Sequence, residues 1–343
     1  MSVAVTFHPT YLLGAAILTL TYALIAWIEG RELKKPIQYG LTALALVSPI
    51  LYYTYTSFNG SSPEMAARAQ EILVNVRIPH HALASQWFDA TVVAKLVLVI
   101  AAITIAFRRG HSPNNSTGGN PARRLGWILL ITSGITALLT LLQISTRNNE
   151  LALLFPWRLS ILIVPVSTAL LMAFCVDWLL RSASMQTTQA RHFVYLLSTA
   201  VIFLAVLVGG IRFALDLQRK AAVPERALET FVYTQKSPGD IYLTPIKMQD
   251  FRLETGAPAF IDFKSIPYQD SDVLEWRRRV RLAESFYSNV DCNQLETLSK
   301  KEGITHIVLE ITPTIPTCTF VETIYEDEQY MLWRINLKQA ASR

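Results

Sequence analysis

A stretch rich in chemically active side chains, RIPHHALASQWFD at residues 77–89, lies between two long apolar segments. Its charged and titratable members are Arg77, His80, His81 and Asp89. Imidazoles and carboxylates bind metals, a carboxylate beside a hydroxyl acts as a general base, and clustered cations bind phosphate. The remaining alternative is a packed loop, in which Pro79 ends a helix and Trp87 lies at a membrane interface.

Metal binding is the least favoured of these interpretations. Adjacent residues such as His80 and His81 point in different directions on most backbones, and no H-x-x-x-H, C-x-x-C or H-x-D spacing occurs nearby. We therefore expect no metal and no other cofactor. The phosphate interpretation adds two arginines from the next loop, Arg147 and Arg158, to Arg77 and the histidines. Together these side chains could hold a lipid phosphate or diphosphate through charge-assisted hydrogen bonds.

Asp89 is the carboxylate of this loop that lies nearest to the next apolar segment. To act as a general base it must reach an acceptor hydroxyl and have a pKa suited to the working pH. The structural alternative is an N-cap, because Asp89 stands beside Thr91 at the start of that segment. We expect the cap, and Asp89 remains the catalytic candidate of the loop.

The elements that hold these residues are expected to be membrane helices. Hydrophobic residues make up 51% of the 343 in the chain, above the globular norm of about 45–50%. Six segments have the length of about 20 mostly apolar residues that a bilayer crossing requires. They are residues 11–28, 37–57, 91–107, 125–145, 159–180 and 193–211. The third contains Lys95 near its end, where a lysine can extend to the interface.

Orientation follows from the positive-inside rule. The loops after the first, third and fifth segments carry nine lysines and arginines, and the alternate loops carry four. This predicts a multi-pass protein of the inner (plasma) membrane with an outer N-terminus and an outer loop at 58–90. After six crossings the C-terminal tail is outside as well. The first residues lack a basic start, so no cleavable signal peptide is expected.

Charge divides the chain into two parts. Residues 219–343 hold 16 Lys and Arg against 18 Asp and Glu, whereas the longer part before them holds 15 against 8. We predict an all-α transmembrane helical domain at 1–218 and a soluble, extracytoplasmic α/β domain at 219–343. The basic excess flanks apolar segments and is not interleaved with aromatic residues, so no nucleic-acid partner is expected.

The pattern of the tail predicts a small sheet covered by helices. Helices are expected at 223–236, 272–287 and 293–302, and strands at 240–245, 259–263, 305–310, 320–327 and 330–336. The last two strands are expected to form an antiparallel pair. In an oxidising compartment Cys292 and Cys318 could form a disulfide, with two free thiols as the alternative. Cys175 is expected to pack inside the fifth apolar segment.

A second candidate site lies in this tail. Ligands of open α/β sheets bind outside the carboxyl ends of strands, and Lys264 follows the strand expected at 259–263. The candidates there are Lys264, Tyr268, Asp270, Glu275 and Arg278. Asp272 can cap the next helix, with Glu275 three residues later. The alternative is structural: Lys264 pairs with an acid, Pro267 shapes the loop and Trp276 belongs to the core.

The segment FRLETGAPAFIDFKSIPYQDSDVLEWRRRV, residues 251–280, resembles the C-terminal region of uncharacterised bacterial multi-pass membrane proteins that share a domain of unknown function. The shared features are a strand ending in D-[FW]-K, a Pro-aromatic pair and an E-W-x-x-R helix. Those proteins are similar to GT-C-type glycosyltransferases, which use polyprenyl-phosphate sugars and carry a soluble domain on the outer face. HPTYLLG, RIPHH and FPWRLSILIVP also fit that layout.

The resemblance implies a protein that engages a lipid-linked sugar at the outer face, with membrane lipid as its partner. GT-C enzymes keep their catalytic acidic residue in a large outer loop after a first span that starts inside, and this chain shows neither feature. Two alternatives follow: a truncated relative, or a shared architecture alone. The competing hypothesis is a non-catalytic membrane anchor that presents an α/β binding or assembly domain.

Other classes of function have little support in the sequence. It contains no G-x-G-x-x-G, P-loop or G-x-S-x-G motif, which disfavours soluble nucleotide and hydrolase chemistry. Transporters carry ionisable residues near the middle of the membrane. Here Lys95, Asp177 and Arg212 all lie near the ends of apolar segments, so the centre of the expected bundle is uncharged.

Overall fold

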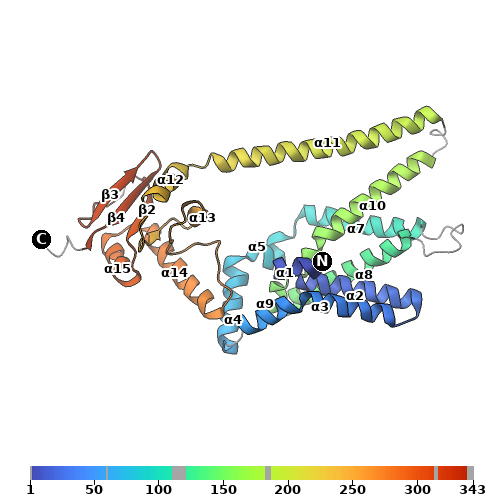
Figure 1. The fold of residues 1–343 in the computed structure, drawn as a ribbon, viewed down its shortest axis with the longest axis horizontal. Coiled ribbons are helices and arrows are strands. Elements are labelled where there is room, and N and C mark those ends of the chain that lie inside the picture. The colour runs from blue at the N-terminus through green and yellow to red at the C-terminus, as the bar shows by residue number, and fades with distance from the viewer. Residues whose placement is uncertain (1, 59–60, 110–120, 182–186, 313–315, 338–343) are drawn as a thin grey trace. The chain divides into compact units, whose positions relative to one another are not determined.

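The chain divides into two compact units, Met1–Phe203 and Leu204–Arg343 (Figure 1). A computed structural model describes residues 2–58, 61–109, 121–181, 187–312 and 316–337. The described part of the first unit is helical, and the second combines helices with one sheet. The boundary lies within α11 (Thr188–Ala221), and the division expected at residue 218 falls near the end of this same helix.

Five helical stretches among the described residues are long and apolar enough to cross a membrane. They are Pro9–Gly30, Ala90–Arg109, Pro121–Thr146, Asn149–Arg181 and His192–Ala221. They include the helices α2 (Leu12–Gly30), α7 (Ala90–Arg109), α8 (Pro121–Thr146), α10 (Ser160–Arg181) and most of α11. The chain therefore carries the helices of a membrane protein, and five of the six expected segments have the required character.

The remaining expected segment, residues 37–57, is the second in the chain and forms α3 (Lys34–Ser57), which has 24 residues but is less apolar because its end reads YYTYTS. A short turn separates it from α2, where Arg31 adopts a left-handed backbone with φ of 53°. The helix then packs back against α2 and α1 (Ser2–Phe7). Val47 of α3 shares a buried cluster with Ala15 of α2 and Val5 of α1.

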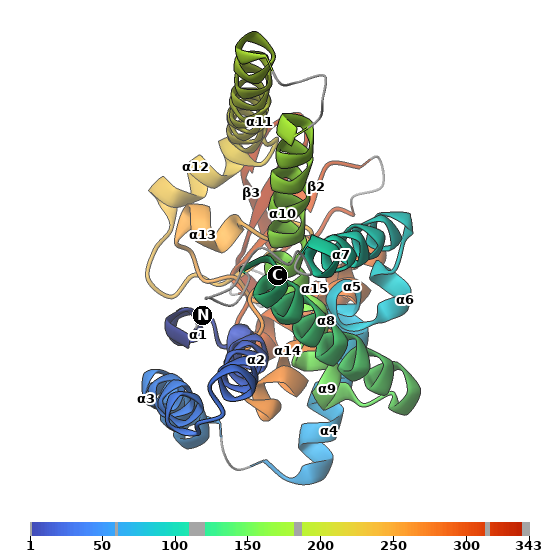
Figure 2. The ribbon, with the colours of Figure 1, turned by 90° about the vertical axis from the view of Figure 1, so that its right-hand side faces the viewer.

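The centre of the first unit is a core shared by α2, α7, α8 and α10 (Figure 2). Its buried members are Ile17, Val99, Ala102, Leu129 and Ile163 from these helices, together with Leu159, which directly precedes α10. Gly126 marks a close approach of α8 to α7, since a Cβ at that position would lie 3.0 Å from the Cβ of Ala106. Apolar packing from all four helices fixes the positions of their ends, which carry the polar residues.

The connection between α3 and α7 forms a packed cap of short helices. It contains α4 (Pro63–Ile72), the π-helical turn η2 (Leu73–Arg77), α5 (Pro79–Ala82) and α6 (Ala84–Trp87). The Ser62 hydroxyl caps α4 by accepting a hydrogen bond from the Met65 N–H at 3.2 Å. Val74 and Ala82 bury themselves against Ala152 of α9 (Asn149–Leu153), which belongs to the next connection. Residues 63–77 are thus helical, and the last turn is wound as a π-helix before Pro79.

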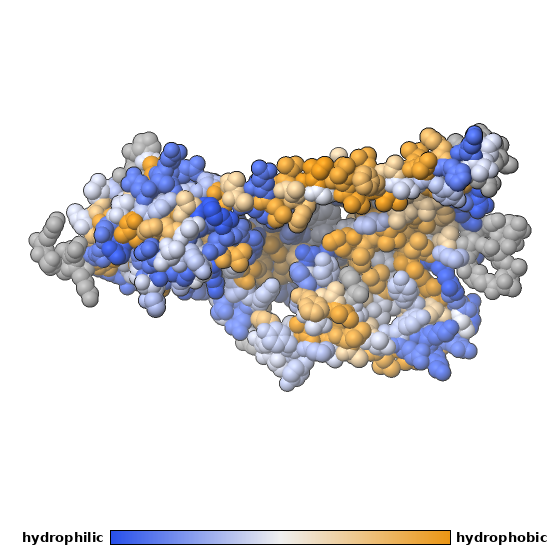
Figure 3. Space-filling view, turned by 45° about the horizontal axis from the view of Figure 1, so that its top comes forward, coloured by the Kyte–Doolittle hydropathy of each residue, from blue (hydrophilic) through white to orange (hydrophobic). Residues whose placement is uncertain are grey.

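Helix α11 has an apolar surface that the chain leaves uncovered. From Tyr195 to Ala221 its described residues are exposed or half-buried, and Leu196, Phe203 and Val206 are each about two-thirds exposed or more. Figure 3 shows this surface as an orange band along the helix. Between Tyr195 and Ile211 the helix bears no charged residue, and a helix segment that is apolar all round suits the interior of a membrane and not water.

The sheet of the second unit has the strand order β1-β2-β4-β3. Its strands are β1 (Tyr242–Leu243), β2 (His306–Glu310), β3 (Val321–Glu326) and β4 (Tyr330–Ile335). β1 pairs with β2 in parallel, and β4 is antiparallel to both of its neighbours, so the expected hairpin at the end of the chain is confirmed.

Helices cover this sheet. They are α12 (Arg226–Gln235), α13 (Phe251–Thr255), α14 (Asp270–Ser288) and α15 (Cys292–Glu302). Val308 of β2 packs with Leu228 of α12 and Phe251 of α13. Its neighbours Ile307 and Leu309 point to the opposite face because side chains alternate along a strand. They too are buried, so both faces of the sheet are covered.

Two local predictions for this unit are wrong. The strand expected at 259–263 is reduced to one parallel bridge between Ala259 and Tyr242, because the chain then turns at Asp262. The carboxylate of Asp262 accepts hydrogen bonds from the N–H groups of Lys264 and Ser265. Asp272 is not a helix cap, since α14 begins two residues earlier with Gln269 at the N-cap position.

Candidate functional site

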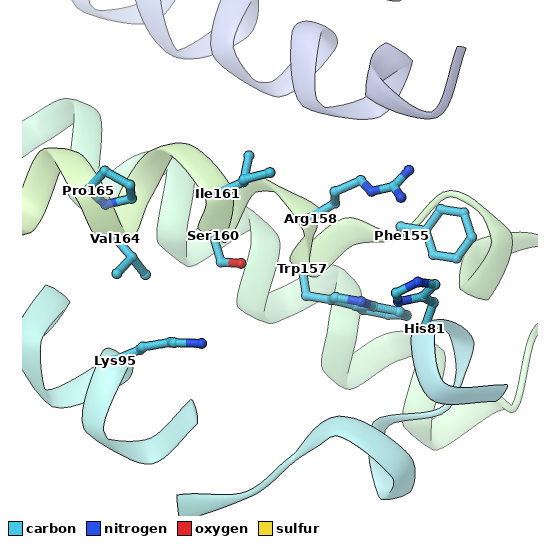
Figure 4. Close-up of a pocket in the computed structure, with 9 residues that line it drawn as sticks. All are labelled: His81, Lys95, Phe155, Trp157, Arg158, Ser160, Ile161, Val164 and Pro165. Atoms are coloured by element: carbon cyan, nitrogen blue, oxygen red, sulfur yellow. The ribbon is translucent and has the colours of Figure 1, made fainter. Parts of the chain in front are cut away.

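A cationic hollow of about 390 Å³ lies in the first unit, where α10 begins. Among the described residues it is lined by His81, Lys95, Phe155, Trp157, Arg158, Ser160, Ile161, Val164 and Pro165 (Figure 4). The cations come from three separate segments: His81 from the cap, Lys95 from α7, and Arg158 from η3 (Pro156–Leu159). Three of the lining residues are therefore cationic or can become so, and none of these nine is acidic.

Arg158 is held in place by the N-terminal segment of the chain. Its guanidinium donates a hydrogen bond to the Thr10 hydroxyl and lies 5.7 Å from the centre of the Tyr11 ring. The Thr10 hydroxyl also lies 2.7 Å from Nδ1 of His8. On the other side, the ring of Phe155 lies 5.1 Å from the guanidinium carbon. Arg158 has no acidic partner among the described residues, and cation–π contacts of this kind stabilise its charge.

Phe155 lines the hollow and has an unusual backbone conformation. Phe155 has φ of 48°, a left-handed conformation that is rare for a bulky residue and is typical of functional sites when the surroundings enforce it. It precedes Pro156, and a proline disfavours the α conformation of the residue before it. Trp157 follows and packs against Trp87 of α6, with ring centres 5.0 Å apart and the ring planes tilted by 31°.

His81, in α5 of the cap, is the residue of the cap that lines the hollow. The pKa of His81 is lowered, first by burial and then by the positive potentials of His80, Arg158 and Arg77. The His80 and His81 rings are 4.2 Å apart, and Arg158 lines the same hollow as His81. A neutral imidazole among cations is ready to take up a proton when an anion binds.

Lys95 lies in the second turn of α7 and extends toward Trp157 in Figure 4. Among the described residues it forms no ion pair, although it is near enough to Asp89 to contribute to the lowered pKa of that carboxylate. The sequence suggested only that Lys95 reaches the interface, and its presence in the site was missed. The available signal was a lysine inside an apolar segment that starts beside the histidine-bearing loop.

The helix ends strengthen the positive potential of the hollow. Both α7 and α10 have their N-terminal turns there, and a helix N-terminus acts as roughly half a positive charge. Pro165 has no N–H, so the carbonyl of Ile161 lacks its usual partner within α10. The hollow thus has cationic side chains that can bind an anion, and an apolar wall formed by Ile161, Val164 and Pro165.

Four of the residues proposed from the sequence do not line this hollow: Arg77, His80, Asp89 and Arg147. Arg77 and His80 act on it only through the positive potential that they exert on His81. Arg147 is exposed at the end of α8 and does not line the hollow. Asp89 caps α7, accepting hydrogen bonds from the Thr91 hydroxyl at 2.6 Å and the Val92 N–H at 3.0 Å. These bonds lower the pKa of Asp89, which makes the carboxylate a weaker base.

The second unit has its own hollow of about 310 Å³. Its lining includes Arg252, Phe260, Asp262, Asp272, Glu275, Trp276 and Arg279. Glu275 is the one member of the predicted tail site that lines it. Lys264 instead forms an ion pair with Asp250 at 3.0 Å, and Trp276 is buried with its indole N–H bonded to the Asp262 carbonyl. Tyr268 is 81% exposed.

Arg278 joins two helices in this unit. It forms a two-bonded ion pair with Glu275 of α14, at 2.7 and 2.8 Å, and a second with Glu302 of α15 at the same distances. The hydrogen bonds from Arg278 are the main cause that lowers the pKa of Glu275 to about 2. Asp270 begins α14 outside this network. The geometry gives Arg278 a structural role.

Cys292 and Cys318 form a disulfide in the structure, with 5.6 Å between their Cα atoms. It ties the start of α15 to the segment before β3. Cys175, in contrast to expectation, is exposed on α10 and does not pack inside the bundle. No group of three or more metal-ligating side chains occurs in the part of the chain that the structure describes.

Comparison with known proteins finds a match to one protein family, and the match lies in the second unit. A domain of unknown function (DUF6798) matches residues 224–283, which extend from α12 into α14 and include every residue lining the smaller hollow. The match covers the segment whose motif resembles a domain of unknown function, so that part of the expectation is confirmed. No curated protein matches the chain.

Proposed function

We propose that this chain is an integral membrane protein whose cationic hollow binds the phosphate of a lipid-linked, polyprenyl-phosphate sugar. The observation that carries the proposal is the convergence of His81, Lys95 and Arg158 on one hollow with an apolar wall. Hydrogen bonds between cationic side chains and phosphate oxygens are stronger than neutral ones. The lipid chain would lie against Ile161 and Val164, on helices suited to the hydrocarbon core.

We propose six crossings of the membrane, with α3 as the second. α3 packs against α2 in the opposite direction and bears no charged residue from Pro36 to Ser57. A helix lying along a spanning helix shares its depth, and the exposed Leu41, Leu44 and Tyr52 of α3 suit lipid better than water. Six crossings, with the positive-inside orientation, leave the hollow and the second unit on the outer side.

The disulfide supports this outer location of the second unit. Disulfides persist in oxidising compartments and are rare in the cytosol. Six crossings from an outer N-terminus bring Cys292 and Cys318 to that side, whereas five would leave them in the cytosol. The test is a pair of reporters, one fused before Ser2 and one after Arg343. Reporters on the same, outer side support the proposal, and opposite sides refute it.

Sugar transfer, as in the GT-C-type glycosyltransferases that the chain resembles, also needs a base for the acceptor hydroxyl. The described lining of the hollow contains no carboxylate, and Asp89 is engaged as a cap. This observation favours a second candidate: a non-catalytic membrane protein that binds the lipid phosphate while its second unit binds or assembles with another molecule.

Binding of a polyprenyl phosphodiester to the full chain in detergent tests the proposal. Arg158→Gln is expected to weaken binding at least tenfold, as expected for loss of a charged hydrogen bond of about 1.5–3 kcal/mol. Arg147→Gln is the matched control, because Arg147 lies outside the hollow, and should change affinity less than twofold. Lys95→Gln is a second test that leaves the Thr10 contact intact. Equal affinity of all three variants and the wild type would exclude this site.

A further inference from the structure

The first unit contains another hollow, of about 500 Å³, at the opposite ends of α7 and α10. Its described lining comprises Ile105, Arg108, Arg109, Leu171, Phe174, Cys175 and Trp178. The first hollow lies at the N-terminal ends of these two helices and this one at their C-terminal ends, so the helices run parallel. About ten residues separate Lys95 from Ile105, which places the two hollows roughly 15 Å apart along α7 at 1.5 Å per residue.

Positive charge is in excess at this end. Arg109 forms an ion pair with Asp177 at 2.7 Å, and the same carboxylate accepts a hydrogen bond from Arg181 at 2.8 Å. Arg108 forms no ion pair with any residue that the structure describes. Three arginines thus stand against one aspartate and the two partial negative charges of the helix C-termini, each roughly half a charge. The balance is positive.

The remainder of the lining is apolar, and two of its members, Cys175 and Trp178, are exposed. Leu171, Phe174 and Trp178 form one wall on successive turns of α10, and Trp178 is 61% exposed. Tryptophans are enriched at the level of lipid headgroups, where the ring is partly in hydrocarbon and the indole N–H meets the polar layer. An apolar wall below a cationic rim has the shape and charge of a site for a lipid.

We infer that this hollow holds one anionic phospholipid of the leaflet that surrounds the C-terminal ends of α7 and α10. The phosphodiester would lie at Arg108 and Arg109, and one acyl chain along the Leu171, Phe174 and Trp178 wall. Basic hollows between membrane helices on the cytoplasmic side bind anionic headgroups in this way. The charge selects an anionic lipid over zwitterionic phosphatidylcholine. The site is separate from the first hollow and does not depend on the sugar.

Native mass spectrometry of the full chain released from lipid nanodiscs measures this binding. The discs contain phosphatidylcholine with increasing phosphatidylglycerol, and the number of retained phosphatidylglycerol molecules gives an apparent affinity. Arg108→Gln should weaken the tightest site about fivefold, as expected for one basic residue near anionic lipid. Arg123→Gln removes an arginine of α8 that does not line the hollow, and should change the affinity less than twofold.

The rate of alkylation of Cys175 can be measured on the chain without any substitution. It is exposed in the hollow, and the other two cysteines form the disulfide. Phosphatidylglycerol should slow its alkylation by an apolar maleimide relative to phosphatidylcholine alone, and Arg158→Gln should leave this protection unchanged. Equal rates in the two lipids, or equal weakening by Arg108→Gln and Arg123→Gln, would overturn the inference even if the first hollow binds its ligand as proposed.

Discussion

Arg158 donates a hydrogen bond to the hydroxyl of Thr10, a residue 148 positions earlier in the sequence. The N-terminal segment therefore forms part of the support of the cationic hollow, although neither Thr10 nor His8 lines it. Because the Arg158 guanidinium has aromatic neighbours and no acidic partner among the described residues, Thr10 orients it without neutralising its charge. That combination leaves Arg158 able to bind an anion.

We predict that Thr10→Val lowers the free energy of unfolding by about 1 kcal/mol, the net contribution of one hydrogen bond. Thermal unfolding of the full chain in detergent measures this change. Thr104→Val is the control, since among the described residues the Thr104 hydroxyl bonds to the carbonyl of Ile100 in its own helix and to no other segment. If Thr10 positions Arg158, Thr10→Val also weakens binding of the phosphodiester and Thr10→Ser restores it. Unchanged binding in Thr10→Val would limit Thr10 to stability alone.

Binding of a phosphodiester should strengthen as the pH falls. In the free protein, burial and neighbouring cations hold the pKa of His81 below its ordinary value of 6.5. A bound anion favours the charged imidazole and raises that pKa, so binding takes up a proton. Affinity therefore rises as the pH falls through the interval between the two pKa values. The phosphodiester itself does not titrate in this range.

Affinity measured at several values between pH 8 and pH 5 tests this linkage. His81→Asn should remove most of the pH dependence, whereas His192→Asn, which lies outside the hollow, should preserve it. A pH dependence that is the same in His81→Asn and the wild type would show that another group is responsible.

Acid should weaken the contact between α14 and α15. The pKa of Glu275 is about 2 in the folded chain because of its bonds to Arg278, against an ordinary value of 4.5. The pKa of Glu302 is lowered as well, again chiefly by Arg278. A lowered carboxylate pKa contributes stability that is present above the unfolded value, so this contribution is lost as the pH falls from about 4.5 toward 2.

Arg278→Gln should reduce that acid dependence without abolishing it, because Arg279 also bonds to Glu275 at 2.7 Å. It should lower stability near pH 7 by about 1 kcal/mol or less, because the pairs are partly exposed. Hydrogen exchange of α14 and α15 in the full chain reports on this contact directly. Arg281→Gln is the control on the same helix, since Arg281 forms no ion pair among the described residues. Equal exchange in the two variants would contradict the role assigned to Arg278.

Loss of the disulfide should destabilise the second unit by about 3 kcal/mol, the loop-entropy value for a loop of this length. The bond joins residues 26 positions apart. Cys318→Ala and the reduced wild type should therefore show faster hydrogen exchange in α15 and β3, while Cys175→Ala should not. Free thiols at Cys292 and Cys318 in protein prepared from cells under non-reducing conditions would show that the bond does not form there.

Local patterns in the sequence were sufficient for most of the helices. Runs of apolar residues predicted α2, α7, α8, α10 and α11, because a bilayer crossing requires length and apolarity, which are properties of consecutive residues. The terminal hairpin was predicted for a similar reason: β3 and β4 are adjacent in the chain and flank an acidic turn. Among the candidate site residues, Arg158 and His81 were singled out by charge and by their place between apolar segments.

The tertiary structure decided what these segments do together. Residues 259–263 have a strand-like composition, but only Ala259 finds a partner in β1, so the expected strand does not form. From the sequence, Arg147 and Arg158 were equally good candidates for binding phosphate. In the structure, Arg158 lines the hollow with His81 and Lys95, and Arg147 does not. The physical reason is that a hollow depends on contacts between segments far apart in the chain, which helix packing determines and local composition does not.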